Sequence, residues 1–217
     1  MYNTKKMTTI SLLCTIAYVV MLTKNLFPAL FPSASFLQYD PKDVVVVIGG
    51  FIYGPLASFV ISLIVSFIEM ITVSDTNIIG CIMNVASTCA FACTAAAIYS
   101  RRRTVAGGVI GLIVGSICAT ATMLVLNYWV TPLYMHLDRK VISENLLPVF
   151  LPFNLIKSVL NSAIVLLIYK PTTRVLRRTG LLNTGKQYSS RRGNIAVLLA
   201  ATFMLVICAV ALIILNN

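Results

Sequence analysis

Three polar side chains interrupt an apolar stretch in the second half of the chain. Residues 149–168 read VFLPFNLIKSVLNSAIVLLI, and this stretch carries Asn154, Lys157 and Asn161. Their spacing of three and then four residues places them on one face of a helix. A lysine at the centre of a lipid bilayer costs about 2.5–3.5 kcal/mol on insertion scales, and asparagines are costly there too. We therefore favour a helix whose polar face looks into a cavity; the alternative is that Lys157 extends its ammonium group outward to the membrane surface.

Further candidate site residues, most of them polar, are expected at a similar depth, near one end of several apolar spans. These are Asn84 near the start of one span, Asn127 at the end of another, and Leu37, Gln38, Tyr39 and Asp40 from the loop SASFLQYDPKD. Amide groups both donate and accept hydrogen bonds, and rings such as those of Phe36 and Tyr39 can stack on a flat ligand. Together these residues predict a pocket for a small, flat molecule rich in heteroatoms. Each asparagine alone could instead form an amide contact between helices.

The sequence carries no enzyme motif. It lacks the H-E-x-x-H, G-x-S-x-G and G-x-x-x-x-G-K-[ST] patterns, and its single histidine, His136, is assigned to an outer loop. Cys89 and Cys93 are one helical turn apart, but without His or carboxylate neighbours they are interpreted as small buried hydrophobic residues. We expect no catalytic residues, no metal and no cofactor. Any uphill transport would then draw its energy from a partner protein.

The composition indicates that lipid surrounds most of the chain. Of its 217 residues, 59% are hydrophobic and 11% are charged, and the mean hydropathy is +0.92. A soluble domain carries about a quarter charged residues. Apolar runs at about 8–24, 44–54, 56–73, 78–99, 106–130, 150–169 and 194–215 predict an all-α integral membrane protein built as one bundle. The first run is expected to be a retained helix, because no A-x-A-like cleavage site follows it.

Segment 44–54 differs from the other apolar runs because it is too short to cross a bilayer upright at 1.5 Å per residue. It precedes the breaker pair Gly54-Pro55. We expect a partial or tilted helix inside the bundle, whose Gly49-Gly50 pair allows close approach of a neighbouring helix.

The placement of charge predicts an orientation. With a cytoplasmic N-terminus and alternating spans, twelve of the seventeen Lys and Arg residues fall on the inner side. The outer side then holds Lys24, Lys42, Arg139 and Lys140. This bias follows the positive-inside rule and places the protein in the cell membrane with an extracellular C-terminus. Because the basic residues flank apolar spans, we expect membrane lipids as their partners and no nucleic acid. Asp40 and Asp43 are assigned to an outer loop, and Glu69 to the outer end of its span.

Two motifs carry a resemblance to a known family. The stretch FLQYDPKDVVVVIGGFIYGPLASFVISLI and the later PFNLIKSVLNS resemble the substrate-binding S component of an energy-coupling factor (ECF) vitamin transporter, and most closely its riboflavin-specific type. The resemblance covers roughly residues 5–178. It implies a six-helix S-component bundle over 1–178 that binds riboflavin near the outer face. Residues 179–193 would form a basic cytoplasmic linker, and 194–217 an additional C-terminal transmembrane helix outside the six-helix pattern.

The resemblance also implies roles for particular residues. Asn154 and Lys157 match ligand contacts, Asn127 matches the asparagine at the end of the fifth span, and Leu37, Gln38, Tyr39 and Asp40 match the segment that covers the ligand. The partners implied are a transmembrane coupling subunit and two cytoplasmic ATPase subunits. Small residues of the first helix would contact the coupling subunit, here Ser11 and Thr15 where alanines are usual.

One departure bears on the ligand. Riboflavin-type members carry a glutamate after a glycine at the start of the fourth span, whereas this chain has Cys81 after Gly80. The phosphorylated flavin FMN and other vitamins therefore stay open as ligands. The alternative from a different class is a membrane scaffold or small channel in which the asparagines only join helices.

Overall fold

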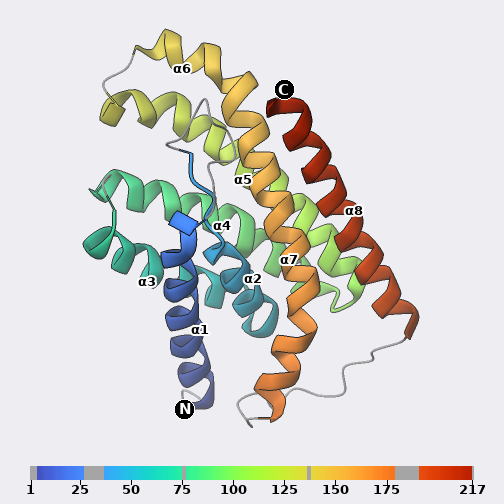
Figure 1. The fold of residues 1–217 in the computed structure, drawn as a ribbon. Coiled ribbons are helices and arrows are strands. Elements are labelled where there is room, and N and C mark those ends of the chain that lie inside the picture. The colour runs from blue at the N-terminus through green and yellow to red at the C-terminus, as the bar shows by residue number, and fades with distance from the viewer. Residues whose placement is uncertain (1–3, 27–36, 75–76, 136–137, 179–190, 217) are drawn as a thin grey trace.

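Helices make up most of the described part of the chain. The computed structural model describes residues 4–26, 37–74, 77–135, 138–178 and 191–216 (Figure 1). The elements within these ranges are α1 (Thr4–Leu22), the 3₁₀ helix η1 (Thr23–Leu26), α2 (Lys42–Tyr53), α3 (Pro55–Thr72), α4 (Asn77–Arg101), α5 (Val105–Met135), α6 (Arg139–Asn145), the π-helical segment η3 (Leu146–Phe150), α7 (Leu151–Arg178) and α8 (Arg191–Asn216). The predicted all-α class is confirmed.

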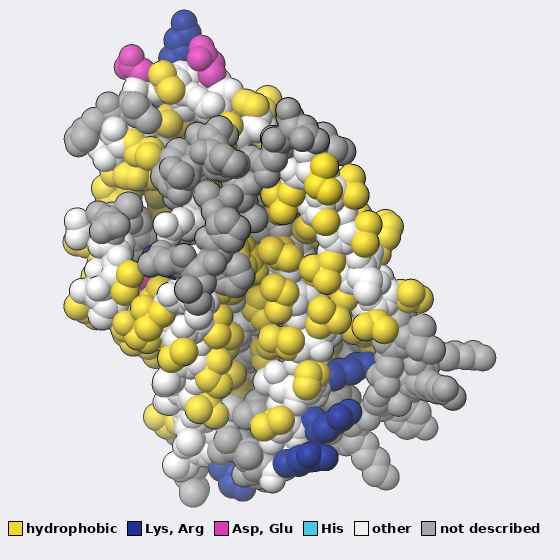
Figure 2. All heavy atoms as spheres, viewed as in Figure 1, with side chains coloured by type: hydrophobic (Ala, Val, Ile, Leu, Met, Phe, Trp, Pro, Cys, Tyr) yellow, Lys and Arg dark blue, Asp and Glu magenta, His cyan; other side chains and the backbone are white. Residues whose placement is uncertain are grey.

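Five helical segments of the described chain are long and apolar enough to cross a membrane. They are Thr4–Leu22, Pro55–Thr72, Asn77–Arg101, Val105–Met135 and Arg139–Val175. A shorter apolar stretch, Val197–Ile213, belongs to α8. Figure 2 shows hydrophobic side chains along the length of the visible face, with most of the visible Lys and Arg at its lower end and a smaller charged group, which includes Asp and Glu, at its upper end. The sides of the bundle are therefore suited to lipid.

The short helix α2 lies inside the bundle, as expected. It contacts α1, α3, α4 and α7, and every residue from Lys42 to Ile52 is buried. A Cβ atom at Gly49 would lie 2.4 Å from Ile61 Cδ1, and one at Gly50 would lie 2.0 Å from Ser58 Oγ. Glycine is therefore needed at both positions for α3 to approach α2. The chain reverses at Gly54, whose φ of +93° suits glycine.

Glycines also set the close contact between α4 and α5. A Cβ at Gly111 would lie 2.7 Å from the carbonyl oxygen of Ala95, and one at Gly115 would lie 2.6 Å from that of Phe91. Their i, i+4 spacing places both glycines on one face of α5. The two long helices therefore pack backbone to backbone in the first part of α5.

The region before α7 differs from the prediction. Arg139 and Lys140 were expected in an outer segment between two apolar spans, but they begin the helix α6, which continues through η3 into α7. The segment LLPVF contains Pro148, which cannot donate a backbone hydrogen bond, and it adopts π-helical geometry. At the other end, α7 runs to Arg178, beyond the predicted end of the apolar span near 169. The last helix, α8, packs along α7 and ends at the opposite end of the molecule from the N-terminus (Figure 1).

Candidate functional site

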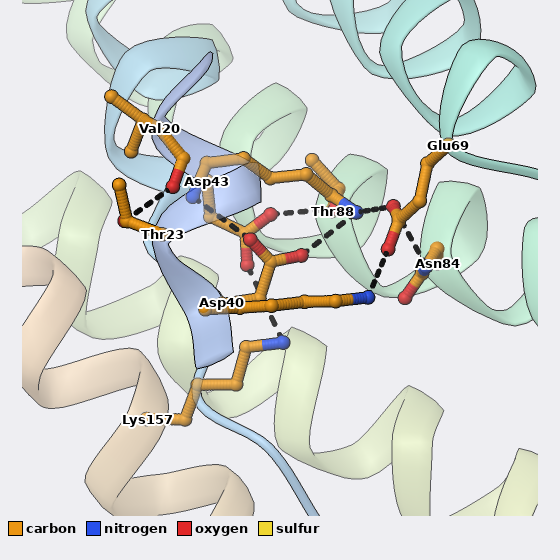
Figure 3. Close-up of polar contacts among 10 residues, drawn as sticks. Val20, Thr23, Asp40, Asp43, Glu69, Asn84, Thr88 and Lys157 are labelled. Atoms are coloured by element: carbon orange, nitrogen blue, oxygen red, sulfur yellow. Dashed lines mark hydrogen bonds and ion pairs between the residues drawn. The ribbon is translucent and has the colours of Figure 1, made fainter. Parts of the chain in front are cut away.

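Three carboxylates and three ammonium groups meet near the start of α2. Asp40, Asp43 and Glu69 supply the negative charges, and Lys24, Lys42 and Lys157 supply the positive charges. We call these six residues the ion cluster. Figure 3 shows Asp40, Asp43, Glu69 and Lys157 converging from separate parts of the chain. The formal charges of the cluster sum to zero, which makes its burial tolerable.

Glu69 of α3 joins the two ends of the segment between α1 and α2. Its Oε1 lies 3.3 Å from Lys24 Nζ in η1, and its Oε2 accepts a hydrogen bond from Lys42 Nζ. Asn84 of α4 donates to the same Oε2 at 3.2 Å. The Lys42 ammonium also lies 2.8 Å from Asp40 Oδ2, and only 1% of Lys42 is exposed. Each charge here has a partner of opposite sign.

Asp43 is the partner of Lys157. Its Oδ1 accepts a 2.6 Å hydrogen bond from Thr88 Oγ1, and its Oδ2 lies 3.8 Å from Lys157 Nζ. Asp43 is 4% exposed, and the Lys157 side chain is 17% exposed. The ammonium group of Lys157 therefore lies near a buried carboxylate, while the cavity predicted beside this helix face stays a prediction.

The assignment of Lys42 and Asp43 to an outer loop was wrong. Both residues lie in the first turn of α2 and are buried, since α2 is surrounded by other helices. A charged residue next to an apolar run is usually predicted to be exposed to water. Here, opposite charges on α2, α3 and α7 pair with one another inside the bundle. The segment DPKD, with three charges directly before four valines, was a usable signal for a buried cluster in a chain with so few charges.

The electrostatic surroundings perturb two groups in the segment before α2. Burial favours a neutral Asp40, but the ammonium groups of Lys42 and Lys157 outweigh it and hold the pKa of that carboxyl below its usual value. Burial, reinforced by the negative charge of Asp43 and Asp40, raises the pKa of the Tyr39 hydroxyl. Asp40 is therefore a stable anion, and Tyr39 a stable hydrogen-bond donor, at neutral pH.

Two further buried amide groups lie on α5 and α7, and the one on α7 contacts Tyr39, the residue before Asp40. Tyr39 Oη donates a 2.6 Å hydrogen bond to Asn161 Oδ1, and Thr131 Oγ1 donates a 2.9 Å bond to Asn127 Oδ1. Asn127 is 3% exposed and Asn161 is 1% exposed. Among the described residues, neither Nδ2 atom has a hydrogen-bond partner. An unsatisfied buried donor costs about 1–3 kcal/mol, so these two N–H₂ groups are available for a ligand.

Asn154 differs from the other two asparagines. Its Nδ2 donates a 2.8 Å hydrogen bond to the carbonyl oxygen of Phe150, at the end of η3, and the residue is 5% exposed. The side chain is thus held against the irregular start of α7. That bond uses the amide nitrogen, and an amide oxygen such as Oδ1 can act as an acceptor.

The remaining predicted site residues are only partly brought together. Leu37 and Asn84 are half-buried, with Asn84 bound to Glu69, whereas Gln38 is exposed. Cys81 is half-buried near the start of α4. Ser11 and Thr15 are both exposed on α1, where a partner can reach them. Phe36 and His136 lie outside the described residues.

The chain matches one protein-family model. Residues 5–169 match the model described as "ECF transporter, substrate-specific component". This match covers α1 through most of α7 and stops before α8. The family is one of transport components and not of enzymes.

Relatives of known name are similar to the chain over most of its length. It is 32% identical to the riboflavin transporter RibU of Staphylococcus aureus (strain TCH60), over 82% of this chain and 95% of that protein. It is 29% identical to the riboflavin transporter FmnP of Bacillus subtilis (strain 168), over 76% of this chain and 90% of that protein.

A solved structure shares the fold. The chain superposes with a TM-score of 0.68 on a structure reported as "Structure and mechanism of the S component of a bacterial ECF transporter". The two are 29% identical, and the match covers 81% of this chain and 99% of the other. The charged and amide residues described above therefore lie on an S-component fold.

Proposed function

The chain belongs to the family of substrate-specific components of ECF transporters, and on that premise we propose that it binds riboflavin for uptake across the cell membrane. Relatives about 30% identical over most of both chains are named riboflavin transporters. The site supports the same ligand from its own chemistry. Riboflavin is a neutral, flat tricyclic ring with amide-like donors and acceptors at one end and a polyhydroxyl tail.

The observation that carries the proposal is the pair of unpartnered buried amides. Asn127 on α5 and Asn161 on α7 each present an Nδ2 donor that no described residue accepts. A ring carbonyl or a ribityl hydroxyl can accept from each of them, while Asn154 Oδ1 can accept from a ring N–H. Ligand binding would then remove the cost of two unsatisfied donors.

Charge balance favours riboflavin over its phosphorylated relative. Lys24, Lys42 and Lys157 each face a carboxylate, so the described part of the site offers no ammonium group free of a counterion. A phosphate group would enter next to Asp40 and Asp43 without a cation of its own. Burying such a charge is costly unless it is paired. We therefore infer a preference for the neutral vitamin.

As an S component, the protein would work with a transmembrane coupling subunit and two cytoplasmic ATPase subunits. Ser11 and Thr15 are small, exposed and one turn apart on α1, so a helix of the coupling subunit could approach closely at these two positions. The excess of Lys and Arg in the segments assigned to the inner side supports a cytoplasmic N-terminus. In that orientation the ion cluster lies toward the outer face, and α8 returns the chain to the outside.

The direct test is equilibrium binding to the purified protein. Riboflavin fluorescence should be quenched in a saturable titration that ends at one ligand per chain. FMN should bind more weakly, and unrelated vitamins such as thiamine and biotin should not compete. Absence of quenching by a monodisperse, folded preparation would refute the assignment, and stronger competition by another vitamin would replace riboflavin as the ligand.

A further inference from the structure

The last helix has no counterpart in the matched family region, which ends at residue 169. Yet α8 packs along α7, the helix that carries Asn154, Lys157 and Asn161. In Figure 1 the two helices run side by side for most of their length. The contact between them therefore bears on the site.

The residues of α8 that face the bundle follow a regular pattern. Val197, Ala201 and Cys208 are buried, and Met204 and Ala211 are partly buried and packed on the core. These five positions repeat at alternating intervals of four and three residues, which is the spacing of a helix seam. The opposite side of α8 is apolar and exposed, as at Phe203 and Val206. One face of α8 is therefore built to pack on protein and the other to meet lipid.

The seam contacts two different parts of the bundle. Val197 and Ala201 belong to the main core cluster together with Val165 and Leu166 of α7. Further along α8, Cys208 forms a second cluster with Phe153 and Ile156 of α7. Its sulfur lies 3.8 Å from the carbonyl oxygen of Ile156, in contact with the α7 backbone. The outer half of α8 therefore reaches the turn of α7 that bears Asn154 and Lys157.

The same cluster includes the segment before α2. Leu37 packs against it, as do Ala211 and Leu212 of α8. Leu37 lies two residues before Tyr39, the donor to Asn161. The outer half of α8 thus touches both parts of the chain whose relative position sets the geometry of the amide groups.

We propose that α8 positions the ligand site: its Cys208 end fixes the Phe153–Ile156 turn of α7 and the Leu37 segment against each other. This inference rests on the proposed riboflavin function. A binding group must be held to within about 0.5 Å by the packing behind it, so a change in this second cluster alters affinity without touching the ligand. The inner half of the seam, at Ala201, packs in the main core cluster and, among the described residues, is not part of this second cluster.

Matched substitutions on one helix separate positioning from general packing. Cys208→Phe should raise the riboflavin dissociation constant by about tenfold or more, since misplacement of contacts by an ångström weakens their interaction strongly. Ala201→Phe crowds the same seam two turns away and should lower thermal stability while leaving the dissociation constant within about twofold of wild type. Val206→Phe, on the exposed side, should change neither. Cys208→Ser, which keeps the size of the side chain, should bind riboflavin with nearly the wild-type dissociation constant.

The outcomes are distinguishable from failure of the proposed function. If the wild-type protein does not bind riboflavin, the function is wrong. If the wild type binds and Cys208→Phe binds equally well, or if Ala201→Phe weakens binding as much as Cys208→Phe, the positioning role of α8 is wrong. Should Cys208→Phe fail to fold, Ala211→Leu adds less volume to the same cluster and decides between the same outcomes.

Discussion

The hydroxyl of Tyr39 donates a 2.6 Å hydrogen bond to Oδ1 of Asn161, and both side chains are buried. This bond joins the segment before α2 to the middle of α7, 122 positions further along the chain. Because a hydroxyl proton must point at an acceptor, the bond also fixes which way the amide faces. Nδ2 of Asn161 is left unpartnered among the described residues, ready to donate to a ligand.

Removing that hydroxyl should therefore weaken ligand binding more than folding. In Tyr39→Phe the ring keeps its packing, but Asn161 can rotate its amide and lose its preset orientation. We expect riboflavin affinity to fall by about 0.5–1.5 kcal/mol, or roughly 2- to 10-fold, as for one hydrogen bond. Fluorescence quenching titrations measure this change. Tyr134→Phe, near the end of α5, is the matched control and should bind as the wild type does; an unchanged constant for Tyr39→Phe would mean that the bond does not orient the site.

A substitution at Asn127 should change riboflavin affinity without lowering thermal stability. Its Nδ2 is buried and unpartnered among the described residues, and its Oδ1 accepts a hydrogen bond from Thr131, one turn further along α5. Asn127→Leu removes the unsatisfied donor, and the Thr131 hydroxyl can then donate to the backbone carbonyl oxygen of residue 127, four positions earlier in the same helix. We expect the ligand-free protein to keep or gain thermal stability, and riboflavin affinity to fall by about 1–3 kcal/mol.

The alternative function, a membrane scaffold or small channel, predicts the opposite result for Asn127→Leu. If the amide only joins helices, its loss should lower the melting temperature of the ligand-free protein and leave the quenching titration unchanged. Both quantities come from the same purified sample, so the comparison is internal.

The ion cluster should dominate the stability of the region around α2. Lys42 is 1% exposed and faces both Asp40 and Glu69, so Lys42→Met leaves two buried carboxylates short of a cation. Breaking a buried ion pair from one side costs about 3–5 kcal/mol. Thermal unfolding in detergent should show a large fall in melting temperature for Lys42→Met.

A second substitution tests whether charge balance is the cause. Lys42→Met combined with Glu69→Gln removes one charge of each sign, and we expect it to recover a substantial part of the lost stability. Lys140→Met, at an exposed position on α6, should have little effect. If the double variant is no more stable than Lys42→Met alone, the loss does not come from the unbalanced charge of Glu69.

Much of the fold was predictable because it follows from local patterns. Apolar runs, the Gly54-Pro55 break and the i, i+3, i+7 spacing of the polar residues on α7 depend on sequence neighbours alone. The short buried helix α2 followed in the same way, since a run of about eleven apolar residues cannot cross a bilayer upright. These features needed no knowledge of which helices touch.

The ion cluster was not predictable by the same rules. A count of charges per loop predicts that Lys42 and Asp43 are exposed to water, because both directly precede an apolar run. Their burial depends on Glu69, Thr88 and Lys157, which come from three other helices. Such pairing is a property of the packed bundle, and only the density of opposite charges in DPKD hinted at it.

Asp43 should set the preference for neutral flavin over its phosphate ester. Its Oδ2 lies 3.8 Å from Lys157 Nζ, and the six charges of the cluster cancel. Asp43→Asn keeps an acceptor for Thr88 but leaves the site with an excess positive charge next to Lys157. FMN should then gain affinity relative to riboflavin by about tenfold, or roughly 1.4 kcal/mol, and the gain should shrink as salt concentration rises. Competition titrations of both flavins, in the variant and in wild type, give this ratio directly.

The matched control is Asp138→Asn, at an exposed position just before α6. It removes the same charge from the chain and should leave the ratio of the two affinities unchanged. An equal shift in both variants would trace the effect to net charge, and no shift in Asp43→Asn would show that Lys157 does not meet the phosphate end of the ligand.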